Sequence, residues 1–111
     1  MVEQQLHYDL IQLAALENVM HLWDARFAMR MHEATTADLD DLRTHLCTMH
    51  DGLPAVLVPT YQSIERVLAD AMAFVEVRDA GADIHYTFTN LINRSMAVAA
   101  HLQRMHSLIE G

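Results

Sequence analysis

The sequence predicts an all-α protein: an antiparallel four-helix bundle with two long outer helices and two shorter middle helices joined by a proline-containing connector. Apolar residues recur at spacings of three and four through four segments, which is the pattern of helices with one buried face. Both prolines and both internal glycines stand at or between the ends of these segments. At 111 residues, the chain fits a single domain, residues 1–111.

The first predicted helix spans residues 3–33 and has almost no polar face. The residues on and beside its apolar stripe are Leu6, Leu10, Leu13, Leu16, Val19, Met20, Trp23, Phe27 and Met31. One neighbouring helix cannot cover a face that wide, so several partners must bury it, within the chain or on a second copy. Part of this face is expected to form an exposed interface, because large side chains dominate such contacts. The expected anchors are Leu16, Trp23, Phe27 and Met31.

The second predicted helix follows Thr35 and Thr36, either of which can accept a hydrogen bond from a free amide of its first turn. Its apolar stripe is Leu39, Leu42, Leu46 and Met49. This helix should stop near Gly52, which can take the left-handed conformation at a helix end. Residues 53–59 form an apolar connector, because its two prolines disfavour helix in the residue before each of them.

Pro59 is expected to open the third helix, and Asp83 is expected to cap the fourth, over residues 84–109. The third helix carries its apolar stripe on Ile64, Leu68, Ala71 and Val75. The fourth keeps heptad spacing through Ile84, Phe88, Leu91, Ser95, Val98, Leu102, Met105 and Ile109, which favours bundle packing. The long first and last helices should outrun the middle pair, so we expect a homodimer in which a second copy supplies the missing cover.

The charge of the chain excludes some partners. Seven arginines and no lysine stand against fifteen acidic residues, for a formal net charge of −8. The arginines are scattered, so direct binding to nucleic acid is not expected. No apolar run is long enough to span a membrane, and the N-terminal residues do not resemble a signal peptide. Cys47 is the only cysteine, and a cytoplasmic location is therefore expected.

Glu17, His21 and Asp24 share one face of the first predicted helix, at spacings of four and three. Glu17 and Asp24 fall on the apolar stripe, where a buried acid costs free energy unless it is paired or bound to metal. These three residues are therefore candidate metal ligands. With eight histidines and eight methionines in the chain, copper, iron or haem are the alternatives to a protein without a cofactor. A buried polar cluster is the other interpretation, with Glu17 bonded to His21 or with the acids paired to Arg94 or Arg104.

The segment Met49-His50-Asp51-Gly52-Leu53 resembles the core of the phosphoacceptor helix in one class of bacterial sensor histidine kinases. The resemblance covers five residues and implies that His50 receives a phosphoryl group. The basic run that precedes the histidine in that family is replaced here by Arg43-Thr44-His45-Leu46-Cys47-Thr48.

The leading functional hypothesis is a non-enzymatic protein-binding regulator, adaptor or inhibitor from a bacterium or its virus, acting as a homodimer. No nucleophile elbow, phosphate-binding loop or dinucleotide fingerprint points to catalysis. The second hypothesis is a metal- or haem-binding bundle that uses Glu17 and some of His21, His45, His50, His101 and His106. A phosphoacceptor at His50 is the third. The fourth is a pH switch, because eight histidines can gain considerable positive charge near pH 6.

Overall fold

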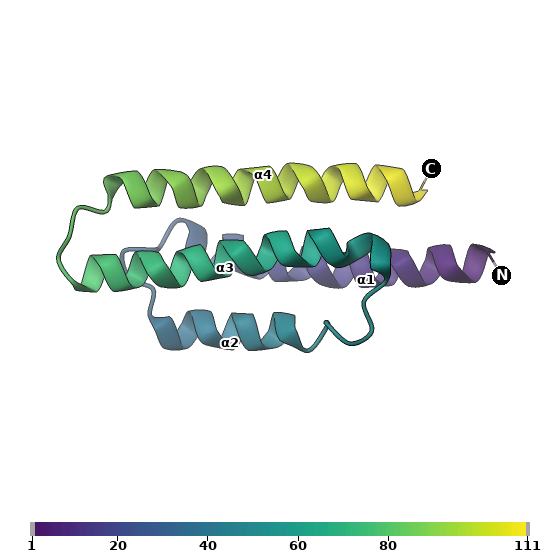
Figure 1. Ribbon diagram of the computed structural model, residues 1–111, viewed down its shortest axis with the longest axis horizontal. Coiled ribbons are helices and arrows are strands. Elements are labelled where there is room, and N and C mark those ends of the chain that lie inside the picture. Colours follow the sequence, from purple (N-terminus) through teal and green to yellow (C-terminus); the bar gives the residue numbers. More distant parts are fainter. Residues whose placement is uncertain (1, 111) are drawn as a thin grey trace.

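The computed structural model describes residues 2–110, and the side chains from residue 4 onward. Within that range the chain forms helices and turns only, and four α-helices pack together, which confirms the all-α prediction (Figure 1). They are α1 (Val2–Trp23), α2 (Thr36–Cys47), α3 (Val58–Asp79) and α4 (His85–Glu110). A π-helical turn, Asp24–Ala28, follows α1, and a 3-10 turn, Ala55–Leu57, precedes α3.

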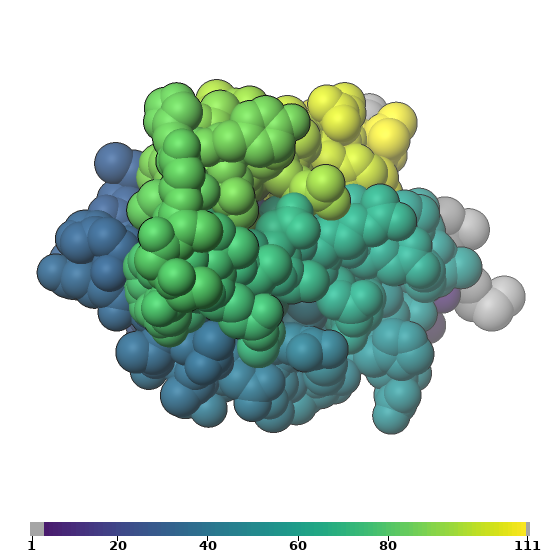
Figure 2. Space-filling model, turned by 60° about the vertical axis from the view of Figure 1, so that its left-hand side comes forward, coloured from purple at the N-terminus to yellow at the C-terminus, as the bar shows by residue number. Residues whose placement is uncertain are grey.

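Each helix packs chiefly against two others: α1 against α2 and α4, and α3 against α2 and α4. The molecule is elongated, with extents of 55 × 23 × 20 Å. The start of α1 and the end of α4 lie at one end of it, and the α3–α4 turn lies at the other (Figure 1). Figure 2 shows the green α3–α4 turn from outside, passing from α3 to α4 over that second end. None of the helices within residues 2–110 combines the length and the apolar character of a membrane span.

The first helix is shorter than predicted. The sequence pattern predicted one helix to residue 33, whereas α1 ends at Trp23 and a π turn follows it. A π turn adds a residue to the helical turn and changes the direction of the side chains after it. Arg78 of α3 then holds the next segment by donating from Nη1 to the carbonyl oxygen of Met31, at 2.7 Å. The apolar spacing continues to Met31 in the sequence, but the α-helix ends at Trp23, and the contact with Arg78 holds the segment that follows.

The relative helix lengths also correct the prediction. α3 has 22 residues, as many as α1, so only α2, with 12 residues, is a short middle helix. Pro59 lies in the first turn of α3, as predicted, where its missing amide removes no helical hydrogen bond.

The predicted helix ends agree with the structure at Thr35 and Asp83 but not at Gly52. The Thr35 hydroxyl accepts from the Asp38 amide at 3.1 Å, and Asp83 accepts from the His85 amide at 3.0 Å, which confirms both predicted caps. The prediction that α2 continues to Gly52 is wrong, because α2 ends at Cys47 and turns follow it. Gly81, with φ of 76°, is the glycine with left-handed backbone among the described residues.

The predicted apolar stripes form the core. In α4 the heptad positions Leu91, Ser95, Val98, Leu102 and Met105 are buried, and the outermost ones are partly buried. Ser95 is the polar member of this seam, and its hydroxyl accepts from the indole Nε1 of Trp23 at 2.8 Å. A buried indole N–H without a partner would cost free energy, so this bond fixes how α1 and α4 align.

Candidate functional site

The four predicted interface anchors lie inside the single chain. Leu16 and Trp23 are fully buried, and Phe27 and Met31 are 7% and 1% exposed. This burial corrects their assignment as exposed anchors. The physical reason is that α2 and α4 both pack against α1 and cover its wide apolar face from two sides. Leu16, Trp23 and Met31 are therefore closed to a partner in this structure, and Phe27 only lines a groove beside α2.

The beginning of α1 remains uncovered. Leu6 is 38% exposed and Ile11 is 51% exposed, whereas Leu13, on the same stripe as Leu6, is fully buried. Figure 1 shows that the first turns of α1 extend beyond the ends of the other helices. The first turns of α1 project although α1 is no longer than α3.

Other apolar side chains are exposed at the same end of the molecule. Val56 and Val58, around the start of α3, are 49% and 38% exposed, and Leu108, near the end of α4, is 74% exposed. The Tyr8 hydroxyl donates to the carbonyl oxygen of Gly52, which ties α1 to the α2–α3 connector. We call this set the open end: Leu6, Tyr8, Ile11, Val56, Val58 and Leu108.

The structure does not bring the three predicted metal ligands together. Glu17 is partly buried and points to α4, whereas His21 and Asp24 are exposed. Within the described part of the chain, no three His, Cys, Asp or Glu side chains are grouped closely enough to hold a metal ion. A site for copper, iron or haem stays a prediction, and the described residues do not show a cluster of side chains that would form it.

Glu17 instead contacts His106 across the α1–α4 seam. His106 Nδ1 lies 3.2 Å from Glu17 Oε1, and Nε2 lies 2.9 Å from Glu110 Oε1, one turn further along α4. The protonated ring can donate from both nitrogens. The hydrogen bonds that the ring donates to the carboxylates of Glu17, first, and Glu110 raise the pKa of His106 above its ordinary value of 6.5. This seam is therefore a pH-sensitive contact between the first and last helices.

His50 lies in the turn after α2 rather than in a helix. Its side chain is exposed, and Nδ1 is 3.5 Å from Asp51 Oδ1. The ring stands edge-on to Tyr61, with 5.5 Å between ring centroids. Burial first, and then the Cys47 thiol, raise the pKa of Tyr61 to about 12. An exposed His50 ring suits a phosphoacceptor. In the kinase family that this segment resembles, however, the histidine lies in a helix, and here it lies in a turn.

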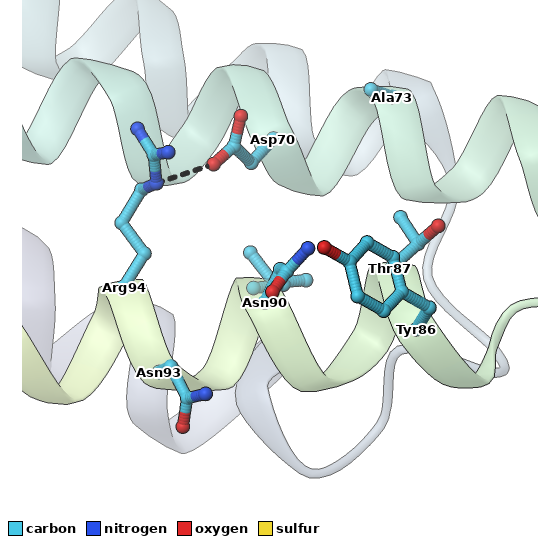
Figure 3. Close-up of a pocket in the computed structure, with 8 residues that line it drawn as sticks. Asp70, Ala73, Tyr86, Thr87, Asn90, Asn93 and Arg94 are labelled. Carbon is cyan, nitrogen blue, oxygen red and sulfur yellow. Dashed lines mark ion pairs between the residues drawn. The ribbon is translucent and has the colours of Figure 1, made fainter.

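The seam between α3 and α4 carries two adjoining polar grooves, which the sequence analysis missed. One, of about 650 Å³, lies between Asp70 and Ala73 of α3 and Tyr86, Thr87 and Asn90 of α4 (Figure 3). Arg94 closes it by reaching across to α3, where its Nε donates to Asp70 Oδ2 at 2.7 Å. The second groove, of about 250 Å³, continues from Arg94 toward the end of α4.

The signal for the second groove was present in the sequence. Residues 85–110 contain two arginines, three histidines and a single acidic residue, Glu110, in a chain with fifteen acids. Counting the charge of each helix separately would have identified α4 as the basic helix.

No protein-family model, curated protein or solved structure matches this chain.

Proposed function

We propose that this protein is a non-enzymatic, protein-binding helical bundle, a regulator, adaptor or inhibitor that acts as a homodimer. The four helices would form an antiparallel bundle, and two bundles would join through their open ends. One observation carries the proposal. The apolar stripe of α1 continues from the fully buried Leu13 outward to Leu6, which is 38% exposed, and the first turns of α1 extend beyond the other helices (Figure 1).

The physical argument concerns the cover of that stripe. Exposed single apolar side chains are ordinary, but several gathered at one end of a small molecule mark an interaction site. Burial of apolar surface stabilises an assembly by roughly 25 cal/mol per Å². A second copy presents the same uncovered turns of α1, so the two can cover each other about a twofold axis.

A binding role suits the remaining surface as well. Outside the open end, a groove between α2 and the end of α1 is lined by Leu22, Phe27 and Leu42, and such a groove can accept a helix from another protein. We expect the dimer to present two copies of this groove to its partner.

The test is the mass of the protein in solution. The wild-type chain should sediment as a dimer in the micromolar range. The double variant Leu6→Glu, Ile11→Glu should sediment as a monomer with unchanged helical circular dichroism, because four carboxylates would be brought together in one interface.

A matched control places two acids elsewhere. Met96 and Tyr86 on α4 are 66% and 76% exposed and lie outside the open end. The double variant Tyr86→Glu, Met96→Glu should therefore remain a dimer. A monomeric wild-type protein, or a Leu6→Glu, Ile11→Glu variant that stays dimeric, would overturn the proposal.

A further inference from the structure

The second groove on the α3–α4 seam gathers cationic side chains. Arg66 of α3 and Arg94 and Arg104 of α4 all line it, together with His101. These are three of the seven arginines of a chain whose formal charge is −8. We call this groove the arginine groove.

Two of the three arginines have no carboxylate partner. Among the described residues, no acidic side chain lies within ion-pair distance of Arg66 or Arg104, whereas Arg94 is paired with Asp70. The lining of the two adjoining grooves therefore carries three arginines against one aspartate, a net charge of two positive units. Guanidinium groups in this state bind oxyanions through paired, charge-assisted hydrogen bonds.

The arginine groove has both space and fixed walls. Ala97 and Val98 form part of its lining, and the small side chain of Ala97 leaves room above the helix. His101 is held on one wall by a hydrogen bond between its Nε2 and the buried Thr60 Oγ1, at 2.7 Å. Arg94 is held on the other side by its ion pair with Asp70 (Figure 3). Two of the lining side chains are thus positioned before any ligand arrives, which lowers the entropy lost on binding.

We propose that the arginine groove binds a phosphate dianion, either free or as the phosphate monoester of a small molecule. The two unpaired guanidinium groups match the charge of a dianion. The neighbouring groove, with Tyr86, Thr87 and Asn90, offers hydroxyl and amide groups to the remainder of a phosphorylated molecule. This site goes beyond the proposed protein-binding function and does not use the open end.

The experiment is a titration followed by the backbone amide resonances of the protein at low ionic strength. The probes are inorganic phosphate, phenyl phosphate and acetate. Both phosphates should shift the amides of residues 63–66 and 94–104 in a saturable manner, and acetate, a monoanion, should bind about tenfold more weakly. Tighter binding of phenyl phosphate would assign the ligand to a phosphorylated small molecule, and equal affinities would assign it to free phosphate.

Two charge-matched variants make the test decisive. Arg66→Gln, Arg104→Gln should weaken phosphate binding about tenfold or more, because two charge-assisted contacts are lost. Arg30→Gln, Arg43→Gln makes the same change of net charge at exposed positions outside the groove and should leave the affinity unchanged. Equal weakening in both variants, equal affinity for acetate, or no saturable shifts would overturn the proposal. The Leu6→Glu, Ile11→Glu variant should still bind phosphate, so this inference and the proposed dimer fail separately.

Discussion

The apolar stripe of α1 has different surroundings at its two ends. Around Leu13 and Trp23 the apolar side chains are fully buried, whereas Leu6 and Ile11, in the first three turns, remain exposed. Leu6 and Leu13 are the same residue type on the same stripe, so residue type does not explain the difference between them. The difference in exposure comes from the neighbouring helices, which end before the first turns of α1 (Figure 1). The comparison shows that an apolar stripe marks what a helix can bury, while its neighbours decide how much of it is buried.

The largest expected effect on stability comes from replacing Trp23, in the buried part of α1. Trp23→Ala should lower the free energy of unfolding by about 3–5 kcal/mol, since it removes a fully buried ring and leaves a cavity. Urea unfolding followed by circular dichroism measures this change. That loss approaches the total stability of many small domains, so partial unfolding is expected.

Trp23→Phe serves as the control, because it keeps most of the ring and removes the donor to Ser95. It should cost about 1–3 kcal/mol. If Trp23→Ala changed only the oligomeric state and left the stability of the chain intact, the placement of Trp23 in the core would be wrong.

A matched pair of substitutions on one stripe sharpens the comparison between the two halves. Leu13→Ala should cost about 2–5 kcal/mol, because Leu13 is fully buried in the chain. Leu6→Ala, the same chemical change at a position 38% exposed, should cost about 0.5 kcal/mol in the monomer. Thermal unfolding at low protein concentration compares the two. Equal losses would mean that the first turns of α1 are covered as fully as the rest.

The smallest expected effect concerns pH and the α1–α4 seam at His106. Because Glu17 and Glu110 raise the pKa of His106 in the folded chain, its contribution to stability is fully present below pH 6.5. That contribution is lost as the pH rises through the raised pKa. His106→Gln should therefore destabilise the protein more at about pH 6 than at about pH 8.5.

The control for this measurement is His21→Gln, since His21 is exposed on α1. Its effect on the free energy of unfolding should be nearly the same at both pH values. An equal pH dependence for both variants would show that the contact between His106 and Glu17 contributes nothing to the pH response.

Helix identity and helix starts were the most predictable features of the fold. The heptad of α4, the Thr35 and Asp83 caps and Pro59 at the start of α3 were all predicted and are confirmed. Each depends on residues within one turn or on a regular repeat, which a linear pattern contains. The ends of α1 and α2 were predicted wrongly, because they depend on turns such as the segment that Arg78 holds through Met31.

The candidate sites were less predictable than the helices. The partner of Glu17 is His106, which is 89 positions away, and not the nearby His21. The arginine groove likewise combines Arg66 with residues of α4. Spacing along one helix indicates which residues share its face, but it does not indicate which residues of another helix lie opposite.

The sequence by itself determined that this chain is helical and which residues of each helix can be buried. It also determined the residues at which α2, α3 and α4 begin. Local hydrogen bonding and the periodicity of 3.6 residues per turn are sufficient for these properties. Only the tertiary structure decided that Trp23 is a core residue, that the beginning of α1 is uncovered, and that three arginines line one groove. These properties depend on which helices are neighbours and where each one ends, and packing between distant segments decides both.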